Sequence, residues 1–188
     1  MLDGHETEAI QSPARDGVTG LETDGTPTIV SISDIHGFLS LAQSALLSLN
    51  DHPDYEPVVE VDAAHRLHWI GGEEYVLVFN GDLIDRGPQS KRVVDMVSRL
   101  IDEAPPGHVR VTMGNHEMGV LMPELYGWDN WYSGQRSPDE QRALCDQIFD
   151  GHVVAAYDGY NVTYAHAGQP TPYDAVEVNE TLITGTEA

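Results

Sequence analysis

The sequence is poor in cysteine and in long apolar runs, and each shortage excludes a class of protein. Cys145 is the only cysteine among 188 residues, so the fold has no intrachain disulfide framework. No stretch reaches the about 18 consecutive apolar residues that a membrane-spanning helix needs. The first residues are acidic and polar rather than basic and apolar, so we expect no secretory signal and a cytoplasmic protein.

Basic residues are also scarce, because 9 lysines and arginines stand against 31 aspartates and glutamates, a formal net charge of −22. A surface this acidic repels a phosphate backbone, which argues against binding to nucleic acid. It also repels itself at low ionic strength, whereas in 1 M salt the screening length falls to about 3 Å. We therefore expect a halophilic protein that works in molar salt, as in a haloarchaeon.

Short apolar runs alternate along the chain with segments in which apolar residues recur at helical spacing. We predict strands at 28–33, 58–61, 67–70, 75–79, 109–113, 153–157 and 161–165, and helices at 38–50, 93–101 and 137–149. The run at 75–79 is apolar throughout, as expected of a strand that is buried on both faces. Ser137 is predicted to cap the helix that follows it. Strands that alternate with helices indicate an α/β fold.

We divide the chain into a polar, glycine-rich N-terminal arm at 1–26, which we expect to be flexible, and one domain at 27–188. Asp158 and Gly159 are predicted to form the turn of a hairpin between the last two strands. The tail at 170–188 is polar and carries no stop signal.

Four of the predicted strands end in a short polar cluster, at 33–37, 80–87, 114–117 and 165–168. Ligands of α/β proteins bind outside the carboxyl ends of the strands, so we expect the four clusters to converge on one crevice. Hard oxygen ligands come from Asp34, Asp82 and Asn115, and imidazoles come from His36 and His166. This set, which has no thiolate, favours a manganese, iron or zinc site over a site for a soft metal.

These side chains suit a pair of divalent ions that act on phosphate. A carboxylate such as Asp82 can bridge two ions about 3.5–4 Å apart, and such a pair polarises a phosphoryl oxygen and lowers the pKa of a bridging water. Arg86 offers a planar fork for phosphate oxygens. His116 is a candidate general acid for the leaving alcohol, and Asp85 is placed to hold its ring in the correct orientation.

Three motifs resemble, in this order, the signature of the calcineurin-like metallophosphoesterases: Asp34-Ile35-His36-Gly37, Gly81-Asp82-Leu83-Ile84-Asp85-Arg86-Gly87 and Gly114-Asn115-His116-Glu117. Four features are similar to one branch of this family, the phosphoprotein phosphatases, which are Ser/Thr phosphatase-like. They are Asp85-Arg86-Gly87, Glu117, Tyr126-Gly127-Trp128 and the segment 164–168. The resemblance covers about residues 28–168. It implies a two-sheet β sandwich flanked by helices and built around two metal ions, of which Mn²⁺ is expected first and Fe or Zn are alternatives.

The resemblance also implies a role for each matched residue. Asp34, His36 and Asp82 would hold one ion, and Asp82, Asn115 and His166 would hold the other.

The substrate phosphate would be bound by Arg86, Asn115 and His116, and the general acid would be His116, paired with Asp85. The nucleophile would be a hydroxide activated by the metals. The chain would then hydrolyse phosphate monoesters, either of small molecules or of phosphorylated Ser and Thr in proteins. The alternatives are a dinucleoside-polyphosphate hydrolase and a metal-binding domain that has lost turnover.

The sequence departs from the family pattern at its end. The family has a further metal-binding histidine downstream, but no histidine follows His166 in this chain. We therefore expect a domain that is incomplete at its C-terminus and a second metal site that lacks one protein ligand. The aromatic residues Tyr126, Trp128, Trp131 and Tyr132 follow the third motif, and they either wall the substrate cleft or, as we expect, pack in the core.

Overall fold

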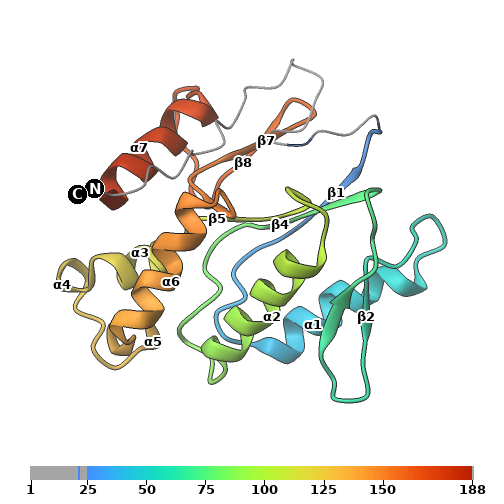
Figure 1. Cartoon of the computed structure of the whole chain (residues 1–188), viewed down its shortest axis with the longest axis horizontal. Coiled ribbons are helices and arrows are strands. Elements are labelled where there is room, and N and C mark those ends of the chain that lie inside the picture. The colour runs from blue at the N-terminus through green and yellow to red at the C-terminus, as the bar shows by residue number, and fades with distance from the viewer. Residues whose placement is uncertain (1–20, 22–24, 188) are drawn as a thin grey trace, which may run out of the picture.

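The computed structural model describes residue 21 and residues 25–187, so most of the arm predicted at 1–26 lies outside the described residues. A parallel sheet of four strands, in the order β1-β4-β5-β6, runs through the centre of the molecule (Figure 1). Its strands are β1 (Thr28–Ile32), β4 (Tyr75–Phe79), β5 (Val109–Thr112) and β6 (Val153–Val154). Two antiparallel pairs accompany it, β2 (Val59–Val61) with β3 (Leu67–Trp69) and β7 (Tyr157–Gly159) with β8 (Val162–Tyr164).

Helices flank this sheet, as expected for the α/β class. They are α1 (Leu39–Leu47), followed by the 3₁₀ turn η1 (Ser48–Asp51), α2 (Ser90–Glu103), α3 (Asn115–Leu121), α4 (Pro123–Tyr126), α5 (Tyr132–Gln135), α6 (Pro138–Phe149) and α7 (Ala175–Glu187). The three predicted helices are confirmed as α1, α2 and α6, and Ser137 caps α6 by accepting a hydrogen bond from the Glu140 amide. None of the described helices is both long and apolar enough to cross a bilayer.

Strand β4 is buried along its whole length, as predicted, because both of its faces carry a core. On one face, Leu77 and Phe79 belong to the large hydrophobic cluster that includes residues of α1 and α2. On the other face, Val76 and Val78 pack with Tyr157 of the β7–β8 hairpin. Figure 1 shows the two layers, with α1 and α2 on one side of the sheet and the hairpin on the other. The second sheet of the expected sandwich is represented among the described residues by this hairpin.

The turn predicted at Asp158 and Gly159 is wrong by two residues. Both residues belong to β7, and the two-residue loop consists of Tyr160 and Asn161, whose φ angles are 49° and 66°. Positive φ at both central residues is the requirement of the type I′ hairpin turn. The glycine serves a different purpose, because a Cβ at Gly159 would lie 2.3 Å from Cδ1 of Ile29 on β1.

The strand predicted at 153–157 is divided into β6 and β7 by a contact from the C-terminal segment. The side chain of Asn179, on α7, accepts hydrogen bonds from the amides of Ala155 (2.7 Å) and Ala156 (3.0 Å) and donates one to the Ala156 carbonyl (2.9 Å). These bonds occupy backbone groups that a continuous strand would use for pairing. Helix α7 itself was not predicted from the polar tail.

Candidate metal and phosphate site

The loops that follow β1 and β4 are joined by backbone hydrogen bonds and form one wall of the site. The Asp34 amide donates to the Gly81 carbonyl (3.2 Å), and the His36 amide donates to the Asp82 carbonyl (2.8 Å). These bonds continue the parallel pairing of β1 with β4 beyond the carboxyl ends of both strands. They place the first two motifs side by side, as the sequence predicts for polar clusters at neighbouring strand ends.

Five residues of these two loops adopt the left-handed backbone conformation. The φ angle is 53° at Asp34, 46° at His36, 53° at Asp82, 69° at Asp85 and 60° at Arg86. Such conformations cost of order 1–3 kcal/mol for residues other than glycine, and they persist only where the surroundings hold them. They concentrate at functional sites, so their presence in a single pair of loops supports a site here.

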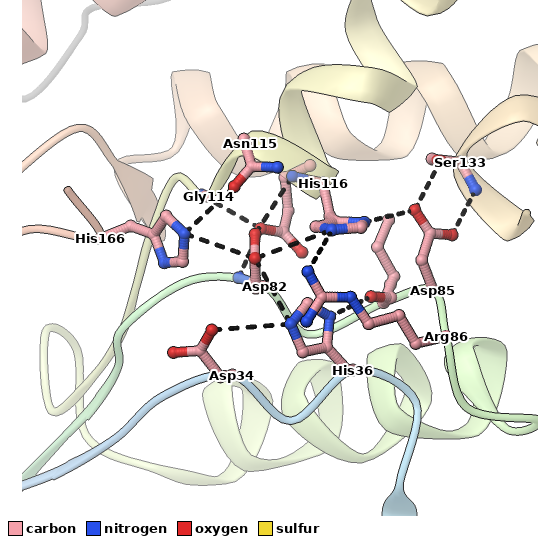
Figure 2. A network of polar contacts seen from close by, with 12 residues as sticks. Asp34, His36, Asp82, Asp85, Arg86, Gly114, Asn115, His116, Ser133 and His166 are labelled. Atoms are coloured by element: carbon pink, nitrogen blue, oxygen red, sulfur yellow. Dashed lines mark hydrogen bonds and ion pairs between the residues drawn. The ribbon is translucent and has the colours of Figure 1, made fainter. Parts of the chain in front are cut away.

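The Asp82 carboxylate lies at the centre of the site, and the residue as a whole is 2% exposed. Its Oδ2 atom is 3.5 Å from Nε2 of His36, 3.4 Å from Nε2 of His166 and 3.9 Å from Nε2 of His116. Its Oδ1 atom accepts a hydrogen bond from the His116 amide (3.1 Å). Asp34 completes the group, with Oδ1 3.5 Å from Nε2 of His36. Figure 2 shows the three imidazoles directed at this carboxylate, two of them from loops and that of His116 from the start of α3.

Two of these imidazoles are oriented through their Nδ1 atoms, so that Nε2 of each faces Asp82. Nδ1 of His36 lies 3.1 Å from the Ile84 carbonyl, and Nδ1 of His166 lies 3.0 Å from the Asn80 carbonyl. A carbonyl only accepts hydrogen bonds, so each Nδ1 donates to its carbonyl and Nε2 is the nitrogen left to bind a metal. Metal-binding histidines are oriented in this way.

The donor set fits a metal ion. Within the described residues, the buried Nε2 atom of His36 has no hydrogen-bond partner. A buried polar atom without a hydrogen bond is unfavourable, and a cation bound beside Asp82 would satisfy this one. Ligand atoms gather in two groups within 4.8 Å, one formed by His36, Asp82 and His116 and the other by Asp34, Asp82 and His166. Both groups contain Asp82, as a carboxylate shared by two ions would require, and the assignment of individual ligands stays a prediction.

Close packing around Asp82 explains why the third motif begins with glycine. A Cβ atom at Gly114 would lie 2.4 Å from Oδ1 of Asp82. The next residue, Asn115, is exposed, and its Oδ1 atom lies 3.3 Å from Nε2 of His166. The amide of Asn115 is therefore at the open side of the site, next to the ligands.

His116 and Asp85 form a buried pair, and each is 1% exposed. Nδ1 of His116 donates to Oδ2 of Asp85 (2.8 Å), while Nε2 lies 3.5 Å from a guanidinium nitrogen of Arg86. Asp85 is fixed in turn by Ser133, whose amide donates to Oδ1 (2.9 Å) and whose hydroxyl donates to Oδ2 (2.6 Å). The imidazole therefore has a single orientation, with Nε2 beside the exposed Arg86.

Glu117 fastens the second motif to the third. Its buried carboxylate accepts hydrogen bonds from the amides of Asp82 (2.9 Å), Leu83 (2.9 Å) and Gly114 (3.1 Å). Burial raises the pKa of Glu117, and the three hydrogen bonds oppose that shift. The sequence marks Glu117 only through its resemblance to one branch of the family, and the structure shows what the side chain holds together.

Aromatic side chains pack directly on the imidazole of His116. Its ring is stacked with those of Trp128 (centroids 4.6 Å apart, 23° between planes) and Trp131 (5.2 Å, 29°), and it meets His36 edge-on (4.8 Å, 81°). Both tryptophans are partly exposed. They therefore lie at the site rather than deep in the core where we expected them.

All eight residues predicted for the site come together: Asp34, His36, Asp82, Asp85, Arg86, Asn115, His116 and His166 (Figure 2). Ser133 was not predicted at the site, and Asn80, although part of the cluster at 80–87, was given no role. Ser133 lies 48 positions from Asp85 in a segment without a motif, so no local signal marks it. Asn80 adjoins the second motif, and its side chain also joins β4 to β5 by accepting from the Thr112 hydroxyl (2.8 Å).

Residues 27–184 match the family model of the calcineurin-like phosphoesterases. The asymmetrical bis(5'-nucleosyl)-tetraphosphatase PrpE of Bacillus velezensis is 27% identical over 155 residues, which are 81% of this chain and 45% of that protein. An uncharacterized protein of Schizosaccharomyces pombe is 30% identical over 146 residues, which are 73% of this chain and 40% of that protein. The chain thus spans less than half the length of these curated relatives.

Two solved structures are similar to the fold. The first is a structure of a cold-active protein tyrosine phosphatase, with a TM-score of 0.59 and 20% sequence identity. The match covers 86% of this chain and 48% of the phosphatase chain. The second is the cold-active protein-tyrosine phosphatase of a psychrophilic Shewanella species, with a TM-score of 0.51 and 23% sequence identity. The match covers 77% of this chain and 43% of the phosphatase chain. At these identities the likeness shows a shared fold.

Proposed function

The chain belongs to the calcineurin-like phosphoesterase family, and from that premise we propose that it hydrolyses phosphate monoesters with the help of two divalent metal ions. The observation that carries the proposal is the Asp82 carboxylate among three imidazoles, one of which has a buried Nε2 without a hydrogen-bond partner among the described residues. The Arg86 guanidinium beside His116 adds a group that binds phosphate. Arg86 and Glu117 support the phosphoprotein phosphatase branch.

The ions would be held by Asp34, His36, Asp82, Asn115 and His166. When bound, a metal pair supplies polarisation of the phosphoryl group and lowers the pKa of a water molecule between the ions. Carboxylate, amide and imidazole ligands without thiolate fit Mn²⁺, which we propose as the working ion, with Fe or Zn as alternatives.

The chain's own residues would position the substrate and move one proton. Arg86 and Asn115 are exposed at the site and would bind the phosphate oxygens. Nε2 of His116 would give a proton to the leaving oxygen, because its other nitrogen is committed to Asp85. Ser133 would keep Asp85 in place throughout the reaction.

A dinucleoside-polyphosphate hydrolase is the second candidate. The observation that favours it is the similarity to the asymmetrical bis(5'-nucleosyl)-tetraphosphatase of Bacillus velezensis. The acidic composition supports a place in a cytoplasm of high salt and argues against nucleic acid as a partner for either activity.

The test is hydrolysis of p-nitrophenyl phosphate by the 188-residue chain in about 2 M KCl, with manganese and then with excess EDTA. Turnover that needs manganese and falls at least about 100-fold in His116→Asn supports the proposal. A folded chain that binds manganese without turnover would instead be a metal-binding domain that has lost activity. Diadenosine tetraphosphate, assayed in parallel, distinguishes the second candidate.

A further inference from the structure

We propose that Trp128 and Trp131 form a stacking wall for the leaving group, so that the site prefers aryl phosphates to alkyl phosphates. This inference rests on the proposed phosphatase function and adds a substrate class to it. The geometry that carries it is the position of two partly exposed indoles against the buried ring of His116.

The two indoles stand on the same side of the imidazole. Their centroids are 5.0 Å apart, whereas two rings on opposite faces of His116 would be much farther from each other. The planes of both indoles lie within 29° of the imidazole plane, so they present their faces rather than their edges to it. Tyr126 extends the surface, with its ring 4.6 Å from that of Trp128.

The wall is fixed to the same group that orients the general acid. The Trp131 amide donates to the Trp128 carbonyl (2.9 Å), which closes the turn that carries both indoles. Two residues further, Ser133 donates two hydrogen bonds to Asp85, the partner of His116. Wall and imidazole therefore share one anchor, and an aromatic ring that lies beside the imidazole, against the exposed part of the indoles, would meet a preorganised surface.

Distance favours a ring that is bonded directly to the leaving oxygen. That oxygen must come within about 3 Å of Nε2 of His116 to receive a proton. In an aryl phosphate the ring follows the oxygen immediately and lies next to the imidazole, in reach of the indoles. In a nucleotide a sugar separates the base from the oxygen, and a phosphoserine offers only a methylene. An aromatic pair contributes about 0.5–1.5 kcal/mol beyond burial, a factor of about 2 to 12 in rate.

The experiment compares phenyl phosphate with cyclohexyl phosphate, which have rings of similar size. For each variant we take the ratio of kcat/KM for phenyl phosphate to kcat/KM for cyclohexyl phosphate. This substrate ratio is then compared between wild type and Trp131→Leu. Phenol is the better leaving group for every variant, so this intrinsic difference cancels. We expect the ratio to fall about 2- to 12-fold in Trp131→Leu and to be largely restored in Trp131→Phe, which keeps a ring.

The matched control is Trp69→Phe, because Trp69 lies on β3 and contacts Glu103 at the far end of α2. It should leave the ratio unchanged. Equal losses for both substrates in Trp131→Leu would make the tryptophan a packing residue and overturn the proposal. A selective loss for adenosine 5'-phosphate, without one for phenyl phosphate, would assign the wall to a base and overturn the aryl preference.

A binding measurement separates this inference from the proposed function. Phenylphosphonate and cyclohexylphosphonate are not hydrolysed, and their affinities for wild type can be measured by calorimetry and by quenching of tryptophan fluorescence. Tighter binding of the phenyl compound, lost in Trp131→Leu, supports the wall even if neither phosphate ester is turned over. Equal affinities in wild type would overturn the wall, whatever the activity.

Discussion

Replacement of Glu117 by glutamine removes the acceptor that joins the second and third motifs. Three backbone amides donate to this carboxylate, those of Asp82 and Gly114 to Oε2 and that of Leu83 to Oε1. Glutamine keeps the volume of the side chain but exchanges one oxygen for an NH₂ group, which donates. In either orientation of the amide, at least one buried backbone N–H faces another donor.

The magnitude follows from the better of the two orientations. With the amide oxygen in place of Oε2, only the Leu83 N–H loses its acceptor, at a cost of about 1–3 kcal/mol. The other two bonds lose the charge on their acceptor, which weakens each by about 1 kcal/mol. Burial raises the pKa of Glu117 because it disfavours the charged carboxylate. Removal of the charge therefore offsets part of the loss of stability. We expect a net fall of about 2–4 kcal/mol in the free energy of unfolding.

The same substitution should loosen Asp82 and with it the metal site. Outer partners of metal ligands contribute about 10- to 100-fold in metal affinity, and we expect a loss in that range for Mn²⁺. The assays are urea denaturation and manganese titration at about 2 M KCl. The control is Glu124→Gln, which changes an exposed glutamate on α4. Equal midpoints and equal manganese affinities in the two variants would contradict this prediction.

Three further predictions concern the proposed general acid, a surface histidine and salt. Ser133→Ala removes the hydroxyl bond to Asp85 but keeps the amide bond, so kcat should fall about 10-fold while manganese affinity, measured by titration, is unchanged. Hydrogen bonds from His68 to Glu103 and then Asp62 raise the pKa of His68. Its stabilisation is therefore complete below the ordinary value of 6.5 and is lost as pH rises through the raised pKa; a denaturation midpoint with the same pH dependence in His68→Gln would contradict this. The net charge of −22 predicts a higher urea midpoint in about 2 M than in about 0.1 M KCl, and equal midpoints would remove the halophile hypothesis.

The central strands and the gathering of the candidate site residues could be predicted because their signals are local. The run 75–79 is apolar at every position, and each ligand cluster follows directly on an apolar run. The carboxyl ends of neighbouring parallel strands meet at one edge of a sheet, so adjacency along the chain becomes adjacency in space. This rule was enough to predict from the sequence that Asp34 and Asp82 lie close together.

The features that were not predicted from the sequence depend on contacts between segments that are distant along the chain. Asn179 divides the predicted strand at 153–157, and nothing near 155 marks the carboxamide that arrives from α7. Gly159 indicates a turn by its type, but its position is set by the close approach of Ile29. Ser133 has no motif and acquires its role only when α5 packs against the loop of Asp85.

The most direct test of the two-metal account is the number of manganese ions bound per chain in wild type and in Asp82→Asn. Asparagine tolerates the left-handed backbone that residue 82 adopts, so the variant keeps the fold and loses only the charge and one carboxylate oxygen. The account predicts two ions per wild-type chain by equilibrium dialysis, and a loss of affinity of at least about 10-fold for both ions in the variant, because both share Asp82. Folded wild type without bound manganese, or a variant that binds two ions as tightly, would contradict it.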